Sequence, residues 1–307
     1  MKTIPLGIEH QSLIKEYFYH FPPEISEHTF TNLFVWRKFR PVYFIEVQES
    51  LLLLIDKENA AGAGKKILFG PPVGTLSAVT AIDTFQDIID GAVRLPAGEA
   101  AELTAAGYPV QADQDNADYV YRVDDLAGLA GRRYAKKRNQ IKKCLRAYQC
   151  TYEPLTPNII PDCVALQKRW CAGRSCSTDP GLCAEYTAIL SLFAHFTELG
   201  LLGGVVRVDG EVQAFAVAEG LRPGTAVWHF EKNLPGIQGL GQLINQWFAR
   251  HALSDFSFVN REQDLGVPGL RQAKKSYHPH HMVEKYTLSP AAGGPECKEI
   301  VADCAGQ

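Results

Sequence analysis

Residues 201–241 of the chain read LLGGVVRVDG EVQAFAVAEG LRPGTAVWHF EKNLPGIQGL G. The apolar segments on either side of Asp209-Gly210 predict two strands, because Asp-Gly between apolar runs is typical of a tight hairpin. Pro223-Gly224 marks another turn, so a third antiparallel strand is predicted after it. The glycine-rich turn at 236–241 leads into a segment with apolar residues at helical spacing. The stretch therefore predicts three antiparallel strands followed by a helix that begins at a glycine-rich turn.

The segments on both sides of this stretch extend the pattern. Before it we predict a strand at 149–153 and helices at about 157–171 and 183–199. After it we predict a strand at 256–259, and a helix and a last strand within 268–288. The order is strand, two helices, three antiparallel strands, glycine-rich turn, helix, strand, helix, strand. Backbone N–H groups in such a turn, together with the positive end of the helix dipole, suit a pyrophosphate.

The N-terminal part has its own short helices and β-type segments. One predicted helix places apolar residues at helical spacing from Val79 to Ile89. Residues 111–118, QADQDNAD, are polar and predict a junction. We therefore expect an α+β protein with an N-terminal half at 1–118, a C-terminal domain at 119–290 and a loose Gly/Pro/Ala-rich tail at 291–307.

Length and charge narrow the class of protein. A chain of 307 residues suits two domains, and 31 basic against 34 acidic residues give a net charge of −3. This balance does not indicate a nucleic-acid or membrane protein as a whole. The longest aliphatic run, at 51–55, is too short to cross a bilayer. We expect a cytoplasmic protein, with a peripheral position at a membrane as the alternative, since Phe34-Val35-Trp36-Arg37-Lys38 suits either an interface or a core.

The cysteine pattern does not indicate a metal site. The chain has eight cysteines and no Cys-x-x-Cys pair. Without a secretory signal we expect reduced thiols that pack as small hydrophobic residues. The His-rich stretch 278–281 has no partner at ligand spacing, so no metal is expected. The cysteines are Cys144, Cys150, Cys163, Cys171, Cys176, Cys183, Cys297 and Cys304.

The basic segment at 132–146 is the most unusual part of the chain. It holds eight Lys and Arg residues and no acidic one. Tyr134, Ile141, Leu145 and Tyr148 lie at helical spacings, which predicts a linker helix with one buried stripe and a cationic face. That face suits the phosphates of a tRNA acceptor arm or of coenzyme A. The alternative is a solvated helix surface.

Several stretches are similar to one protein family, the family built on the C-terminal domain of phosphatidylglycerol lysyltransferase. This family has a tandem GNAT (acyl-CoA N-acyltransferase) fold and is related to the Fem-type aminoacyl transferases. The resemblance implies two GNAT-like halves with mixed, mostly antiparallel sheets flanked by helices. It also implies that the chemistry lies in the C-terminal half or between the halves. The stretches are FTNLFVW at 30–36, KKRN at 136–139, NREQDLG at 260–266 and GLRQAKKSY at 269–277.

The resemblance implies a reaction class. It is transfer of an acyl or aminoacyl group to an amine or hydroxyl by direct attack, with no tightly bound cofactor. The donor would be aminoacyl-tRNA or an acyl-CoA thioester, and the acceptor a small molecule or a lipid. The cationic helix and the poor match of the glycine turn to a pyrophosphate pattern favour tRNA. The alternative is a non-catalytic GNAT-like sensor of a nucleotide, an RNA or an acylated metabolite.

Five residues are candidates for proton transfer. Glu262 and Asp264 follow a strand end, where a carboxylate could position or deprotonate an attacking amine. The alternative for both is an ion-pair network or a helix cap. His229 and Glu231 share a face if the strand alternates, so either could be a base, or they could pair with each other. In many GNAT enzymes a tyrosine near Tyr277 protonates the leaving group; the alternative is an ordinary packed aromatic.

The candidates for donor binding are basic residues and glycines. Arginine after a strand suits a phosphate or carboxylate through its bidentate fork, which selects Arg261. The family motif selects three residues of the basic helix. Two further lysines could contact phosphate. The full set is Lys136, Arg138, Asn139, Gly236, Gly239, Gly241, Arg261, Lys274 and Lys285.

Overall fold

The computed structural model describes residues 2–57, 64–174 and 179–289, which form two compact units. The first unit takes the described residues up to Tyr119, then Glu262–Gln272 and the chain from Met282. The second unit takes Val120–Arg261 and Ala273–His281. The chain therefore returns to the first unit after Arg261. The tail predicted at 291–307 lies outside the described residues.

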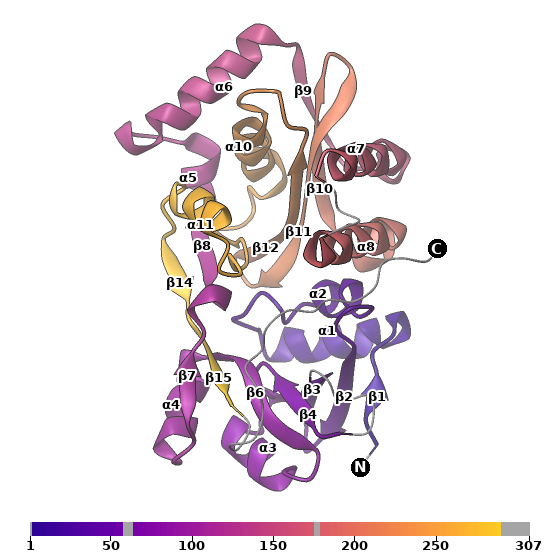
Figure 1. The fold of residues 1–307 in the computed structure, drawn as a ribbon, viewed down its shortest axis with the longest axis vertical. Coiled ribbons are helices and arrows are strands. Elements are labelled where there is room, and N and C mark those ends of the chain that lie inside the picture. Colours follow the sequence, from indigo (N-terminus) through magenta and orange to yellow (C-terminus); the bar gives the residue numbers. More distant parts are fainter. Residues whose placement is uncertain (1, 58–63, 175–178, 290–307) are drawn as a thin grey trace. The chain divides into compact units, whose positions relative to one another are not determined.

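The first unit is built on an eight-stranded sheet (Figure 1). Its order is β1-β2-β3-β4-β6-β15-β7, with β5 paired to β3. Only the β4–β6 pair is parallel among the registered pairs of this sheet. The strands are β1 (Ile4–Pro5), β2 (Val42–Val47), β3 (Ser50–Asp56), β4 (Lys66–Phe69), β5 (Val73–Gly74), β6 (Ile89–Pro96), β7 (Val110–Ala112) and β15 (Lys285–Leu288). The helices are α1 (Gln11–His20), α2 (Phe30–Val35), α3 (Ala78–Thr84) and α4 (Ala97–Ala105), with 3-10 turns at Ile8–His10 and Gln114–Asn116.

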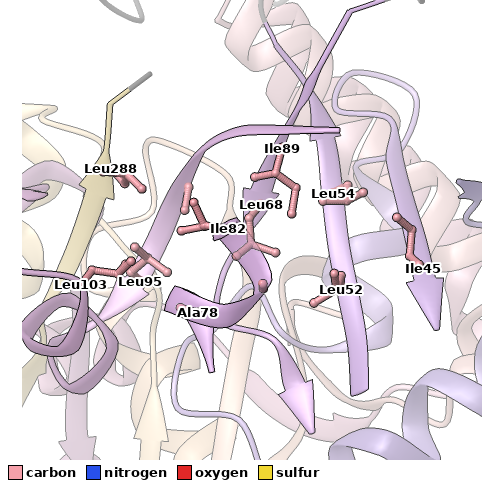
Figure 2. Packing of buried hydrophobic residues seen from close by; sticks show 12 residues of the cluster. Ile45, Leu52, Leu54, Leu68, Ala78, Ile82, Ile89, Leu95, Leu103 and Leu288 are labelled. Carbon is pink, nitrogen blue, oxygen red and sulfur yellow. The ribbon is translucent and has the colours of Figure 1, made fainter. Parts of the chain in front are cut away.

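A hydrophobic core lies between this sheet and helices α3 and α4 (Figure 2). Leu52 and Leu54 of β3 belong to it, together with Ile82 of α3. Side chains alternate along a strand, so Leu51 and Leu53 point to the opposite face. Those two leucines are also 0% exposed. The sheet is therefore buried on both faces at β3, where each buried leucine stabilises the fold by about 1.5–3 kcal/mol.

The helix predicted from Val79 to Ile89 is only partly correct. Helix α3 ends at Thr84, and Ile89 begins strand β6. The Ser77 side chain caps the helix by accepting from the backbone N–H of Thr80 at 3.1 Å. Ile89 joins the same core cluster as Ile82. In the sequence, Ile89 therefore fits the helical spacing of the apolar residues of α3, although it belongs to a strand.

A group of buried charges ties three distant segments of the first unit together. Lys285 donates to Glu27 Oε2 and Asp118 Oδ1, each at 2.6 Å, and all three side chains are 0% exposed. Arg94 lies 3.0 Å from Glu27 Oε1 and 2.6 Å from Asp113. Burial alone would raise the pKa of Glu27, but Lys285 and Arg94 lower it to about 2. Lys285, predicted to contact phosphate, is therefore enclosed between two carboxylates.

The second unit is built on a seven-stranded sheet of order β14-β8-β13-β12-β11-β10-β9. Strands β12 and β13 run parallel, whereas the pairs β8–β13, β11–β12, β10–β11 and β9–β10 run antiparallel. Helices α7 and α8 lie on one side of this sheet and α10 on the other (Figure 1). The strands are β8 (Asp118–Arg122), β9 (Cys150–Pro154), β10 (Leu202–Val208), β11 (Glu211–Arg222), β12 (Thr225–Asn233), β13 (Phe258–Asn260) and β14 (His281–Val283).

The helices from residue 123 onward follow the predicted order and add two. They are α5 (Val123–Gly128), α6 (Ala135–Ala147), α7 (Ile160–Ala172), α8 (Pro180–Ala194), α9 (Phe196–Leu199), α10 (Leu240–Ala252) and α11 (Pro268–Lys275), with 3-10 turns at Arg132–Tyr134 and Pro157–Ile159. Helix α5 was not predicted from the sequence, and the single helix predicted at 183–199 is divided into α8 and α9. The predicted α+β fold, with two mostly antiparallel sheets flanked by helices, is confirmed.

The buried stripe of α6 differs from the predicted one. Tyr134 and Ile141 are buried as expected, but Leu145 is 44% exposed. Lys137 and Cys144 complete the stripe instead. Their spacing of three, four and three residues is as helical as the predicted set. Lys137 was not predicted to be buried because, as a charged residue, it was assigned to the cationic face of the helix.

The expectation of reduced cysteines is wrong at two positions. Cys171 and Cys183 each take part in a disulfide, whereas Cys144, Cys150 and Cys163 are free. A disulfide depends on approach in space, which a search for Cys-x-x-Cys spacing does not detect. Cys176, Cys297 and Cys304 lie outside the described residues.

Replacing Lys285 tests the buried charges of the first unit. Lys285→Met leaves Glu27 and Asp118 buried without their shared cation, so the free energy of unfolding should fall by about 3–5 kcal/mol. Urea unfolding followed by circular dichroism measures this change. Lys65→Met, at an exposed lysine of the same unit, is the matched control and should change stability by less than about 0.5 kcal/mol. Equal stability of the two variants would contradict the structural role of Lys285.

Candidate functional site

Arg261 lies at the centre of a charged and aromatic cluster in the second unit. It follows β13, and its Nη2 donates to Glu231 Oε2 at 2.9 Å. Its guanidinium carbon lies 4.5 Å from the ring centre of Trp228, 5.4 Å from that of Tyr277 and 5.8 Å from that of Tyr121. A guanidinium is well suited to such ring faces because its charge is delocalised and weakly hydrated. Both the charge and the rings therefore fix the direction of this side chain.

Glu231 comes from β12, the strand that runs parallel to β13. The parallel register places the end of β13 beside β12, which brings Arg261 and Glu231 together. Asn245 of α10 adjoins both groups: its amide donates to Glu231 Oε2 at 3.3 Å, or, turned over, accepts from Arg261 Nη2 at 3.1 Å. Burial raises the pKa of Glu231, against the opposing effect of Arg261. A carboxylate in this state accepts protons more readily than an exposed one.

Lys137 adds a second buried cation to the cluster. Its Nζ donates to Ser276 Oγ at 2.8 Å and lies 3.4 Å from the ring centre of Tyr277. Burial and the positive charge of Arg261 lower the pKa of Lys137 to about 8. Lys137 lies within the motif at 136–139 but is not among the residues predicted from the sequence to form the site. Its spacing to Tyr134 and Ile141 was the signal that would have identified it.

The segment that carries Tyr277 is held by hydrogen bonds to its backbone. Tyr134 donates to the Tyr277 carbonyl oxygen at 2.9 Å, and Tyr121 donates to the Lys274 carbonyl oxygen at 2.9 Å. The Lys274 ammonium donates to the carbonyl oxygen of Arg261 at 2.6 Å. Burial raises the pKa of Tyr277, so its phenol stays protonated at neutral pH. Lys274, predicted to contact phosphate, instead anchors the backbone of Arg261.

These side chains form one site, which we call the Arg261 cluster. It consists of Lys137, Glu231, Arg261 and Tyr277, with Trp228, Tyr121 and Asn245 around them. Its two cations face a single carboxylate, and the side chains of Arg261 and Glu231 remain 14% and 20% exposed. An excess of positive charge suits an anionic ligand or a developing oxyanion. Part of each of these two side chains therefore remains accessible to solvent.

The structure separates His229 from Glu231. The pairing of β11 with β12 shifts register between Val217 and Ala218, which marks a β-bulge at His229. His229 Nε2 lies 2.9 Å from Glu219 Oε1, with both side chains nearly buried. Trp228 and Glu231, three residues apart, both contact Arg261. The alternation from which a shared face was predicted therefore does not hold here.

Asp264 is bound into a network of the first unit. It accepts from Tyr119 at 2.6 Å and from Arg271 Nε at 2.8 Å, and its Oδ1 accepts from the backbone of Gly266. The hydrogen bonds from Arg271, stronger than the effect of burial, hold the pKa of Asp264 far below its usual range. This matches the ion-pair alternative for Asp264. Glu262, also in this unit, has φ +59° and accepts from the backbone N–H of Tyr119 at 3.2 Å.

The three predicted residues of the basic helix have different surroundings. Lys136 and Asn139 are exposed. Arg138 donates to the carbonyl oxygens of Leu129 and Gly131 and so holds the turn between α5 and α6. The exposed cations of this segment are Arg132, Arg133, Lys136, Lys142, Lys143 and Arg146. One face of the helix is therefore strongly cationic, while Lys137 reaches the Arg261 cluster from another.

The glycine turn before α10 is explained in part by packing. Gly239 has φ +89°, and a Cβ at this position would overlap the backbone oxygen of Gln140 in α6. A Cβ on Gly241 would lie 3.1 Å from Asn233 Oδ1, whereas one on Gly236 would meet nothing within 4 Å. Gly239 is therefore required by the close approach of α6. That requirement is independent of any bound phosphate.

No group of three or more His, Cys, Asp and Glu side chains in residues 2–57, 64–174 and 179–289 is arranged to hold a metal ion. Across the same ranges, no helix combines the length and the apolarity that crossing a membrane requires.

Residues 20–289 match the family described as phosphatidylglycerol lysyltransferase, C-terminal. The chain belongs to this family. The match confirms the resemblance carried by the four sequence stretches, and it supports a transferase of the acyl- or aminoacyl-transferring kind. The chain has no match among curated proteins.

Solved structures support the family assignment at the level of the fold. A conserved protein of unknown function from Bacteroides thetaiotaomicron is 28% identical, with a TM-score of 0.86 over 95% of this chain and 100% of that one. L-PGS from Bacillus licheniformis is 13% identical, with a TM-score of 0.61 over 91% of each chain. FemX is 9% identical, with a TM-score of 0.60 over 94% of this chain and 97% of that one. The lysyltransferase family and FemX therefore share the fold of this chain.

The lowered pKa of Lys137 predicts how stability changes with pH. Folding lowers this pKa from 10.5 to about 8, so between these values the unfolded chain binds more protons than the folded one. Stability contributed by this group then rises with pH, by up to about 1.4 kcal/mol per pH unit. Lys137→Met should remove that rise, which urea unfolding at pH 8 to 10.5 measures.

Lys136→Met is the matched control, because Lys136 is the exposed neighbour of Lys137 on the same helix. It should keep the pH slope of the original protein. The same slope in Lys137→Met as in the original protein would show that the ammonium is not held in a low-dielectric cluster.

Proposed function

We propose that the protein is an aminoacyltransferase whose chemistry takes place at the Arg261 cluster. The observation that carries the proposal is the convergence of Glu231, Arg261 and Lys137 in the second unit, with 2.9 Å between the Arg261 and Glu231 side chains. Glu231 can accept a proton, Arg261 can bind an oxyanion, and Lys137 can release a proton. Direct attack on an ester needs these three roles.

The roles follow from charge and protonation. Glu231, with its raised pKa, takes the proton of the attacking amine or hydroxyl. Arg261 stabilises the negative charge that develops on the carbonyl oxygen. The new bond forms at the carbonyl carbon as the ester C–O bond breaks. Lys137, whose pKa is about 8, is protonated at neutral pH and passes its proton to the leaving oxygen.

Tyr277 positions Lys137 and supplies a second donor. Its ring lies beneath the Lys137 ammonium at 3.4 Å, and its phenol stays protonated at neutral pH. With Trp228 and Tyr121 it also surrounds the guanidinium of Arg261. These rings exclude water from one side of the cluster, which strengthens each charge interaction within it.

Helix α6 supports tRNA as the donor. Six cations of the basic segment 132–146 are exposed. Among these six, only Arg133 forms an ion pair in the described structure, with Asp125 at 3.1 Å. The same helix delivers Lys137 to the cluster. The phosphates of a tRNA bound to the exposed face of α6 would thus lie on the same helix that places Lys137 at the aminoacyl ester. The packing role of Gly239 removes one reason to assign the glycine turn to coenzyme A.

Substitutions in the cluster test the catalytic proposal. Glu231→Gln removes the proton acceptor at nearly constant shape, and Arg261→Ala removes the oxyanion cation. Each should lower the rate of transfer from a pool of labelled aminoacyl-tRNAs by about 10²–10⁴-fold. Acceptors are amine pools and phospholipid vesicles, and circular dichroism checks folding.

Glu211→Gln is the matched control, because Glu211 is a 70% exposed carboxylate of the same sheet. It should keep the full rate. If both cluster variants also keep it, the site is assigned wrongly. If the protein protects aminoacyl-tRNA from hydrolysis without consuming it, the sensor alternative replaces the enzyme.

Charge reversal on α6 tests the donor. Lys142→Glu places an acidic group among the exposed cations, so tRNA affinity should fall and the dependence of log Kd on log salt should weaken by about one phosphate contact. Filter binding at several salt concentrations measures both. Lys168→Glu, at an exposed lysine of α7, is the control and should leave both unchanged. Stabilisation of the protein by acyl-CoA and not by tRNA, in a thermal melt, would reverse the donor assignment.

A further inference from the structure

Two free thiols lie side by side where helix α6 ends. Cys144, in the last turn of α6, and Cys150, the first residue of β9, place their sulfur atoms 3.9 Å apart. Both are free in the structure. A disulfide between them requires the two sulfur atoms to close this gap to about 2 Å.

The backbone on each side of the pair is already fixed. The Cys144 carbonyl accepts from the N–H of Tyr148 at 3.0 Å, which closes the last turn of the helix. Before Cys150, the Gln149 carbonyl oxygen accepts from the backbone N–H of Asp209 at 2.9 Å, and the Gln149 N–H donates to Asp209 Oδ1 at 3.1 Å. The two sulfurs are therefore held near each other by helix and sheet rather than meeting by chance in a mobile loop.

The two thiols differ in accessibility. Cys144 is 0% exposed, and its Cβ would lie 3.2 Å from a Cβ on Gly239. Cys150 is half-buried. An external reagent can thus reach Cys150 first, while Cys144 is protected and adjacent. This is the arrangement of an attacking and a resolving thiol.

We propose that Cys144 and Cys150 form a dithiol modification site that closes to a disulfide by exchange with a low-molecular-weight disulfide. The Cys150 thiolate attacks the small disulfide, forms a mixed disulfide and releases one small thiol. The Cys144 thiolate then attacks the Cys150 sulfur and releases the second. The protein pair is oxidised by two electrons and the small disulfide is reduced to two thiols. This inference does not rest on the proposed transferase activity.

The cross-link joins the end of α6 to β9. It lies two turns along the helix from Lys137, on the same buried stripe. Burial raises the pKa of Cys144 to about 12 and that of Cys150 above its usual value. Both groups are thiols at neutral pH, so exchange is slow and needs sustained oxidising conditions.

Peptide mapping after treatment with oxidised glutathione tests the proposal. Trypsin cleaves after Arg146, between the two cysteines, so the disulfide links two tryptic peptides that separate on reduction. We expect this linked species to accumulate in the full-length protein and to disappear with dithiothreitol. A wild-type protein that stops at a glutathione adduct on Cys150, or that keeps both thiols open to alkylation, would overturn the proposal.

Single substitutions separate the two roles. In Cys144→Ser, with Cys144→Ala as a second variant for this buried position, Cys150 should stop at the glutathione adduct. In Cys150→Ser the buried Cys144 should stay unmodified. Cys163→Ser is the matched control, because Cys163 is free and buried elsewhere in the unit, and it should leave formation of the cross-link unchanged. Linked peptides that form equally without Cys144 or Cys150 would show that another thiol takes part.

Discussion

The Arg261–Glu231 ion pair organises the second unit around it. A guanidinium can lie against three aromatic rings only if a nearby anion offsets its loss of hydration, and Glu231 is that anion at 2.9 Å. The parallel register places the end of β13 beside the middle of β12, which brings Arg261 close to Glu231. Through the carbonyl oxygen of Arg261 the pair also holds Lys274, and hence the segment that ends in Tyr277. One ion pair thus connects two strands and α11 within a single charged site.

Two buried charge centres among the described residues have different charge balances and therefore different consequences. In the first unit, Lys285 is matched by two carboxylates, and all three side chains are 0% exposed. Such a centre is saturated and serves stability. In the second unit, two cations share one carboxylate, and the charged groups stay partly exposed. Burial and the charge of Arg261 lower the pKa of Lys137 to about 8, and an excess of positive charge suits an anion.

Local sequence patterns predicted the parts of the fold that local forces decide. The hairpin at Asp209-Gly210 and the apolar face of α10 were clear because turn chemistry and helical spacing agree there. Strand β6 was missed because Ile89 also fits the spacing of α3. Long-range pairing was not visible in the sequence at all. Glu27, whose carboxylate binds Lys285, lies 258 residues away from it along the chain.

The candidate site also contains residues that local sequence patterns predicted and residues that they did not. Arg261 and Tyr277 were selected as candidates because they lie in stretches shared with the family, and Glu231 because of its place on a predicted strand. Lys137 was missed because composition does not distinguish it from the other lysines of the basic segment. Its helical spacing from Tyr134 and Ile141 did indicate that it would be buried. His229 was grouped with Glu231 by strict alternation, which a β-bulge interrupts.

The choice of donor depends on charges that the fold leaves exposed rather than on the fold itself. Proteins with this fold can carry different reactions on it, so shared architecture is weak evidence for a donor. Helix α6 presents cations on one face and Lys137 on another, and a rigid helix fixes the relation between them. A donor that binds the outer face by its phosphates is thereby oriented toward the cluster. A compact thioester needs only the glycine turn, whose central glycine is already required by packing against α6. The arrangement of α6 therefore supports the proposal of a long polyanionic donor.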